Sequence, residues 1–149
     1  MPIDNAQLRE AARVCACFNL RRAARAVTRL YDEVLEPGGL RSTGFVAMAF
    51  IQVEGGCGLP RLARTLGVDR STLTRNLKPL ERAGYVTVTT EAGARTAVAR
   101  LTAKGERALE RCIPLWRSAQ GRFEASVGAE GWANVLGGLN RIVASVPDA

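Results

Sequence analysis

The stretch of sequence that decides the fold is LPRLARTLGVDRSTLTRNLKPLERAGYVTVTTEAGARTAVARL, residues 59–101. Its apolar spacing predicts a helix over residues 59–66, a tight turn, and a second helix over residues 69–83. The β-branched run at residues 85–90 and its return at residues 97–101 predict a two-stranded β-ribbon. This order of elements is that of a helix-turn-helix followed by a wing.

The second predicted helix has distinct inward and outward sides. Leu73, Leu77 and Leu80 form one apolar stripe, so the polar and basic side chains fall on the other faces. Asp69 suits the N-cap position, and Gly84 suits a left-handed residue at the C-terminal end. A helix of this size can enter the major groove of DNA.

Positive charge is concentrated in this part of the sequence. The chain carries 21 basic and 14 acidic side chains, for a net charge of +7. Residues 59–107 alone hold ten basic and four acidic side chains, or +6. Such a field attracts polyanions and makes their binding depend strongly on salt. Without the helix-turn-helix pattern, a solvated basic surface that only aids solubility would be the preferred explanation of this charge.

We therefore expect a group of side chains to contact double-stranded DNA. Arginine and asparagine can make bidentate contacts to guanine and adenine, and hydroxyl groups can contact bases or phosphates. A basic residue at the tip of the wing, Arg95, is expected to enter the minor groove. The remaining contacts are expected from the second helix: Arg70, Ser71, Thr72, Thr74, Arg75, Asn76 and Lys78. Of these, Lys78 is expected to contact a phosphate.

Composition limits the other classes of function. At 149 residues and 47% apolar content, the chain is expected to form a single domain. No apolar run is long enough to span a membrane and no secretion signal is evident, so we expect a cytoplasmic protein. The sequence has no histidine, no carboxylate pair in an apolar setting and no phosphate-binding glycine loop. We therefore expect neither an enzyme, nor a cofactor, nor a metal site with histidine ligands.

Long amphipathic helices are predicted on both sides of this region. One continuous helix is expected over residues 7–36, a buried helix over residues 42–53, and further helices over residues 102–146. The first and last of these have more apolar surface than the winged helix-turn-helix region, residues 42–101, can cover. A second copy of the chain would cover them, and a two-fold dimer would place two recognition helices about one turn of duplex apart. The alternative is a monomer in which the flanking helices close on themselves.

Three segments of the sequence resemble the MarR family of bacterial transcriptional regulators: residues 19–32 (NLRRAARAVTRLYD), residues 62–75 (LARTLGVDRSTLTR), and residues 80–86 (LERAGYV) with residues 101–105 (LTAKG). The resemblance extends over nearly the whole chain in the same order. It implies a mainly α-helical homodimer with a small antiparallel β-wing. It also implies repression at a palindromic operator and an effector site between the DNA-binding head and the dimerisation helices.

The wing departs from the family pattern at one position. Family wings usually carry an acidic residue directly before the basic residue at the tip, and its carboxylate holds the arginine. Here Ala94 precedes Arg95, so Glu91 is the acidic residue nearest the tip. This places the geometry of the wing in question, although not its presence.

The four cysteines suggest one kind of effector, because a cytoplasmic protein keeps them as thiols at rest. On a continuous helix, Cys15 and Cys17 would point roughly 200° apart and could not pair with each other. Cys17 and Cys112 both fall on apolar seams, so either N-terminal cysteine is a candidate to meet Cys112 of the same or the partner chain. Some MarR relatives sense organic hydroperoxides with a cysteine early in the first helix. Oxidation of Cys15, Cys17 or Cys112 is therefore one hypothesis, whereas Cys57, in a glycine-rich loop, is expected to be incidental.

Other interpretations stay open. The cysteines are also consistent with a soft metal ion held by thiolates alone, or with buried small hydrophobic residues. Phe18, Tyr31, Phe45 and Met48 are candidates to line a pocket for a small aromatic ligand, although such residues at helical spacing also form cores. A winged-helix interaction module that has lost DNA binding is a further alternative, against which Ser71, Arg75 and Arg95 argue.

Overall fold

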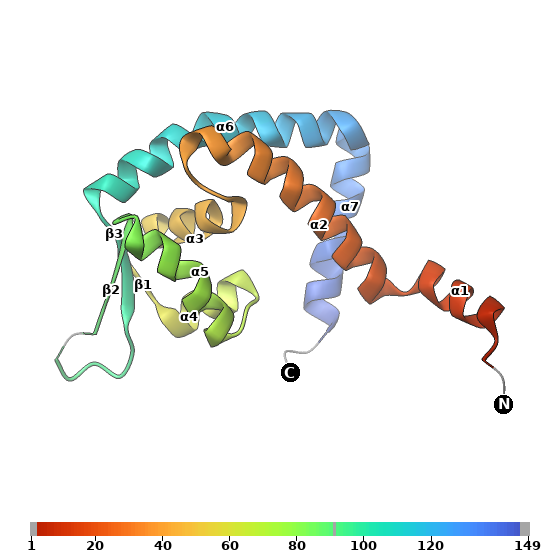
Figure 1. Cartoon of the computed structure of the whole chain (residues 1–149), viewed down its shortest axis with the longest axis horizontal. Helices are drawn as coiled ribbons and strands as arrows, with labels where there is room; N and C mark the ends of the chain where they lie inside the picture. The colour runs from red at the N-terminus through yellow and green to blue at the C-terminus, as the bar shows by residue number, and fades with distance from the viewer. Residues whose placement is uncertain (1–2, 91, 147–149) are drawn as a thin grey trace.

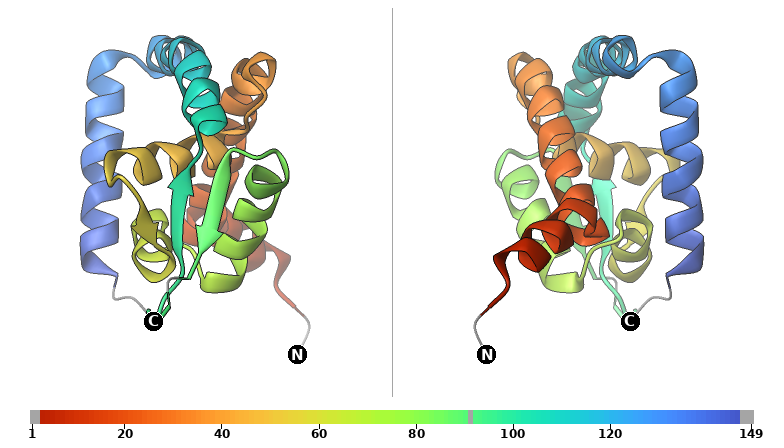
Figure 2. Two further views of the ribbon diagram at one scale, coloured as in Figure 1. Left: turned by 90° about the vertical axis from the view of Figure 1, so that its left-hand side faces the viewer. Right: turned by 90° about the vertical axis from the view of Figure 1, so that its right-hand side faces the viewer.

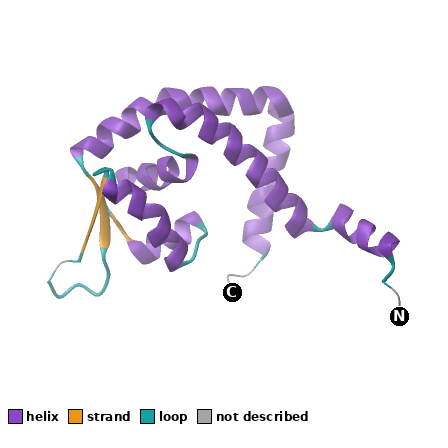
Figure 3. Ribbon diagram, viewed as in Figure 1, coloured by secondary structure: helices purple, strands orange, loops and turns teal. Residues whose placement is uncertain are grey.

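The computed structural model describes residues 3–90 and 92–146 and is mostly helical, with one small sheet at one end (Figures 1 and 3). In chain order the elements are α1 (Asn5–Val14), α2 (Ala16–Leu35), a 3₁₀ turn (Glu36–Gly38), α3 (Ser42–Val53), β1 (Cys57–Gly58), α4 (Leu59–Leu66), α5 (Arg70–Arg82), β2 (Val86–Thr89), β3 (Val98–Leu101), α6 (Ala103–Val127) and α7 (Ala129–Ser145). The expected fold class, mainly α with a small antiparallel β-wing, is confirmed. None of the helices traced over the described ranges has the length and apolarity needed to span a bilayer.

The helix-turn-helix forms where the sequence predicts it. Gly67 ends α4 in the left-handed conformation, with φ of 62°, and Gly84 does the same after α5, with φ of 72°. Asp69 is the N-cap of α5, and its carboxylate accepts a hydrogen bond from the amide of Thr72 at 2.8 Å. The helix continues through Pro79 to its end at Arg82.

The sheet has three strands in the order β1-β3-β2, and not the two that were predicted. In β1, Cys57 pairs with Ala99 and Gly58 with Val98, and both pairings in the sheet are antiparallel. The expectation that Cys57 lies incidentally in a glycine-rich loop was wrong, because Cys57 is buried in this sheet. A strand of two residues among glycines has no β-branched alternation, so its sequence carried no strand signal.

The core lies inside the head, where α3, α4 and α5 pack together and against the sheet, and where α3 also packs against the first part of α6. The stripe predicted for the second helix of the motif is buried as expected. The largest fully buried side chains are Leu35, Met48, Ile51, Leu62, Leu73, Leu77 and Cys112. α3 was expected to be buried all round, but Val46, Phe50 and Val53 are exposed on one of its sides.

The N-terminal region is two helices rather than the single helix predicted over residues 7–36. Cys15 has an extended backbone, with ψ of 112°, between α1 and α2. The side chain of Asn19 donates to the carbonyl of Arg13 at 3.1 Å and to that of Cys15 at 2.9 Å. The Cys15 sulfur accepts from the amide of Phe18 at 3.5 Å, as an N-cap does. Side chains thus satisfy the backbone at the break, which apolar periodicity alone does not reveal.

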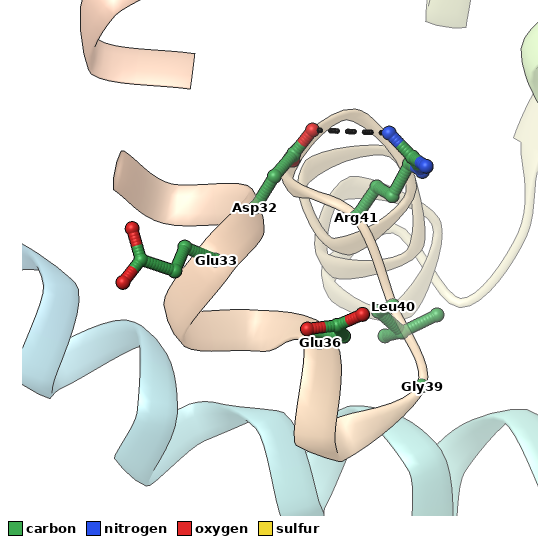
Figure 4. A pocket seen from close by; sticks show the side chains of 6 residues that line it. All are labelled: Asp32, Glu33, Glu36, Gly39, Leu40 and Arg41. Atoms are coloured by element: carbon green, nitrogen blue, oxygen red, sulfur yellow. Dashed lines mark ion pairs between the residues drawn. The ribbon is translucent and has the colours of Figure 1, made fainter. Parts of the chain in front are cut away.

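One acidic side chain joins α2 to the head. The N-cap residue of α3 is Arg41, which makes no side-chain cap. Asp32 of α2 fills that role by accepting from the amide and the hydroxyl of Ser42, each at 2.7 Å. Its second oxygen pairs with Arg41 at 3.6 Å (Figure 4). A carboxylate at a helix N-terminus is favourable, so Asp32 fixes the position of α3 relative to the long helix.

α6 runs from the wing along the top of the molecule, and α7 descends from its far end, behind α2 in the view of Figure 1 (Figures 1 and 2). Thr102 caps α6 by accepting from the amide of Gly105 at 3.0 Å. At Gly105 the first turn of α6 comes close to the backbone of Tyr85. A Cβ at that position would collide with the Tyr85 carbonyl group, whose carbon would be 2.9 Å away.

We predict that Gly105→Ala lowers the free energy of unfolding by about 1–3 kcal/mol, because the backbone on both sides of the contact would have to move. Gly121→Ala in the same helix is the matched control, since nothing lies within 4 Å of the added Cβ. The control should raise stability by about 0.5–1 kcal/mol through helix propensity. Urea denaturation of the two variants measures both effects, and equal effects would contradict the close approach.

Candidate nucleic-acid interface

Five of the residues predicted to contact DNA lie together on one side of α5. Arg70, Ser71, Thr74, Arg75 and Lys78 line a single shallow hollow and are all exposed. Their spacing places them on one helical face, and we call these five residues the outward face. The buried leucines of α5 lie on the opposite side, so packing of the core determines which side chains point away from it.

A carboxylate orders the first turn beneath this face. Asp69 accepts from the hydroxyl of Ser71 at 2.6 Å and from the hydroxyl of Thr72 at 2.8 Å, in addition to the amide of Thr72. These hydrogen bonds, the one from Ser71 first, hold the pKa of Asp69 well below its ordinary value. Asp69 is therefore ionised at physiological pH.

The remaining hydrogen bonds of α5 also engage its polar side chains internally. Arg75 donates to the Thr72 hydroxyl oxygen at 3.2 Å, which links the arginine to Asp69 through one threonine. Thr74 donates its hydroxyl hydrogen to the carbonyl of Arg70 at 2.9 Å. The hydroxyl hydrogens of Ser71, Thr72 and Thr74 are thus all used within the helix.

Arg95 is exposed on the wing and lies near the start of α5. It lines a second hollow together with Arg70, Thr90, Thr96 and the first residues of α4. The convergence of Arg70 and Arg95 joins the wing to the outward face as one cationic surface. The sequence did not predict this joint surface, because the two arginines are distant in the chain. It also did not predict Thr90 and Thr96, whose only signal in the sequence is a hydroxyl on each side of the tip. Glu91, considered as a partner of Arg95, lies outside the described residues.

Two of the predicted contact residues lie apart from the outward face. Thr72 is half-buried and bridges Asp69 and Arg75. Asn76 is half-buried and lines a hollow with residues of α2 and α3, among them Thr28, Tyr31 and Val46. The expectation that Asn76 faces the same way as the rest of the group is therefore not matched by its position.

The C-terminal end of α5 is fixed to the wing and to α6. The Lys104 ammonium donates to the carbonyl of Ala83 at 2.7 Å and lies 5.4 Å from the centre of the Tyr85 ring. The Thr102 hydroxyl donates to the carbonyl of Gly84 at 2.6 Å. A cation and a hydroxyl thus satisfy carbonyls at the C-terminal end of α5, where the helix dipole favours positive charge.

The cysteines fall into two pairs with different surroundings. Cys15 and Cys17 are exposed at the start of α2 in the single chain, so the apolar seam that was predicted to hold Cys17 is not covered there. Cys57 and Cys112 are buried, and burial raises the pKa of both thiols. The argument from a continuous helix also fails, because Cys15 precedes α2.

Cys112 cannot pair with either N-terminal cysteine of its own chain. It packs beneath Gly38, which follows the C-terminal end of α2, whereas Cys15 and Cys17 lie at the other end. α2 has 20 residues and therefore spans about 30 Å. Of the two alternatives, a meeting of these thiols within one chain is excluded, and a meeting with Cys112 of the partner chain stays a prediction.

Of the four residues considered either as pocket lining or as core, two lie in the core. Phe45 and Met48 are buried in the core, and Phe18 is exposed on α2. Only Tyr31 of the four lines the hollow that contains Asn76. The Tyr31 hydroxyl donates to Gln120 of α6, and desolvation followed by the charge of Glu124 raises its pKa. Within residues 3–90 and 92–146, no three cysteine or acidic side chains gather as a metal site would require.

We predict that Asp69→Ala lowers the urea midpoint at neutral pH by roughly half a molar, because α5 loses its N-cap. Since the pKa of Asp69 is lowered by folding, its stabilising effect is complete above the unfolded-state pKa of about 3.9 and is lost as pH falls below it. The difference between wild type and variant should therefore shrink below about pH 4. Denaturation at neutral and acidic pH tests this, and a constant difference would contradict the assignment.

Comparison with known proteins places this geometry among transcriptional regulators. The model of the MarR family matches residues 40–93. The structure of the M. tuberculosis transcriptional regulator MosR in complex with DNA is 40% identical, covers 88% of this chain and 97% of that chain, and has a TM-score of 0.76. A second MosR structure is 38% identical, with coverage of 91% and 100% and a TM-score of 0.76. The regulator SarZ of Staphylococcus saprophyticus is 33% identical over 75 residues, and the match spans about half of each chain, 50% of this one and 51% of SarZ.

Proposed function

Because this chain belongs to the MarR family and is a DNA-binding transcriptional regulator, we propose that it is a homodimeric repressor that binds a palindromic operator and leaves it when an effector acts. The observation that carries the proposal is the joint cationic surface of the outward face of α5 and Arg95. Its site of action would be chromosomal DNA in the cytoplasm.

In the proposed complex, α5 enters the major groove and the wing contacts the minor groove beside it. The outward face contributes Arg70 and Arg75 as bidentate donors to bases or phosphates, and Lys78 as a phosphate contact. Arg95 enters the minor groove, where a narrow A·T-rich stretch has enhanced negative potential. Thr72 acts through Arg75, and Asn76 is assigned no base contact because of its position toward α2 and α3.

Apolar exposure in the flanking helices supports the proposed dimer. Neither α1 nor α7 has a buried residue within one chain. α7 nevertheless carries a series of large apolar side chains that are more than a third exposed: Val135, Leu136, Leu139, Ile142 and Val143. An apolar surface of this kind is typical of an interface, and a second copy would cover it.

Two kinds of effector have support in the structure. A hydroperoxide could oxidise the exposed thiol of Cys15 or Cys17 to sulfenic acid, with release of an alcohol or water. This would alter the break between α1 and α2, where the Cys15 sulfur accepts a hydrogen bond. A small ligand could instead occupy the hollow that contains Tyr31 and Asn76. The metal-responsive alternative has no three-ligand cluster within the described part of one chain.

Arg95→Ala is predicted to weaken binding to a selected operator and to random duplex by a similar factor. It should also reduce the slope of log affinity against log salt by about one unit per wing. Arg122→Ala on α6, also an exposed arginine, is the control and should leave both unchanged. A duplex enriched from a random pool by the wild-type chain serves as the operator. Failure to enrich any duplex would favour the alternative of an interaction module without DNA binding.

Peroxide is predicted to lower operator affinity about tenfold or more, within the usual range of allosteric coupling, and a thiol reductant should restore it. The double variant Cys15→Ser, Cys17→Ser should be insensitive, whereas Cys57→Ala, which removes a buried thiol, should respond like wild type. Fluorescence anisotropy with labelled operator measures the effect. Irreversible loss, or loss that persists in the double variant, would contradict reversible oxidation of Cys15 or Cys17 as the signal.

A further inference from the structure

The hydroxyl groups on the outward face have a fixed hydrogen-bond polarity. A hydroxyl has one hydrogen to donate and two lone pairs to accept with. Ser71 donates its hydrogen to Asp69 at 2.6 Å, and Thr74 donates to the carbonyl of Arg70 at 2.9 Å. Both side chains are exposed and line the same hollow as Arg70 and Arg75. What they can offer a ligand in that hollow is therefore lone pairs.

This polarity decides which groups of DNA they can contact. Phosphate oxygens and the carbonyl oxygens of guanine and thymine are acceptors, so they need a donor from the protein. The groups in the major groove that donate are the exocyclic amines of adenine and cytosine. We propose, on the basis of the proposed DNA-binding function, that Ser71 and Thr74 accept hydrogen bonds from these amines, and that Asp69 is the positioning residue that keeps the face in this state.

Asp69 acts on two parts of the face. Its Oδ1 atom takes the hydrogen of Ser71, and its Oδ2 atom takes the hydrogen of Thr72. Thr72 consequently presents a lone pair to Arg75, which donates to it at 3.2 Å. Arg75 is thereby held as a hydrogen-bond donor beside two acceptors, the hydroxyl groups of Ser71 and Thr74. Ionisation of Asp69 is needed for this arrangement, and its low pKa ensures it at physiological pH.

A scan of amine deletions tests the first part. The full-length chain is titrated with its selected duplex, in which each adenine is replaced in turn by purine and each cytosine by 2-pyrimidinone. Wild type should lose about fivefold or more in affinity at one or more amines. That loss should disappear in Ser71→Ala or Thr74→Val, and the double-mutant cycle removes any effect of the base change on the duplex itself.

Asp69→Asn tests the second part, because it retains the cap but places a donor where Oδ2 accepts the Thr72 hydrogen. Discrimination between the selected duplex and one of shuffled sequence should fall about fivefold to tenfold, while the melting temperature changes little. Thr72→Val should lose the same discrimination, and Thr72→Ser, which keeps the hydroxyl, should retain it. A merely structural role would weaken both duplexes together.

The outcomes separate this inference from the function on which it rests. If the wild type selects a duplex but no amine deletion weakens binding, or if the Ser71 and Thr74 variants keep the same losses, the assignment of acceptors is overturned. If Asp69→Asn and Thr72→Val discriminate like wild type, the positioning role of Asp69 is overturned. A chain that selects no duplex overturns the proposed function, and this inference with it.

Discussion

The rotation of α5 about its own axis is the constraint on which the candidate interface depends. Leu73, Leu77 and Leu80 are buried against the core, so the rotation that buries them also presents the outward face to solvent. A helix rotated by one residue would expose these leucines and bury polar side chains such as Lys78 or Asn76 instead, and both changes are costly. Burial of the leucines thus specifies which polar groups of α5 are exposed to solvent, although the leucines themselves would make no contact with DNA.

A charged residue, Asp69, then orders the side chains that core packing has placed on the surface of α5. The region that holds this helix has a net charge of +6, yet Asp69 stands at its start with a lowered pKa. An acidic side chain weakens the attraction to a polyanion. Its presence here is explained if the carboxylate orders the side chains around it. Asp69 organises Ser71 and Thr72 directly and Arg75 through Thr72. Long-range attraction and local order are therefore supplied by different residues.

Sequence patterns predicted those parts of the fold whose signals are local. The bounds of α4 and α5, the cap at Asp69 and the glycines after each helix follow from neighbouring residues. The features that were not predicted depend on pairing between distant strands, or on side chains that compete with the helix for its backbone hydrogen bonds. β1 exists because β3 offers partners to Cys57 and Gly58, and the break at Cys15 exists because Asn19 binds carbonyls that a continuous helix would use. The convergence of Arg70 and Arg95 requires the folded wing and has no local signal.

The position of Asn76 connects the proposed effector hollow with the proposed DNA contacts. Asn76 follows Arg75 directly, so one helix presents Arg75 to the outward face while Asn76 lines the hollow with Tyr31. The hydroxyl of Tyr31 is in turn bound to Gln120 of α6, and α6 leads into α7, whose apolar side is proposed to meet the partner chain. A ligand in the hollow would alter DNA binding if it favoured one orientation of α5 relative to α2 and α3, which line the hollow with it. The residues that would contact the ligand therefore connect α5 to the helices proposed to form the dimer. The quantity that such a ligand would change is the spacing between the two copies of α5 in the dimer.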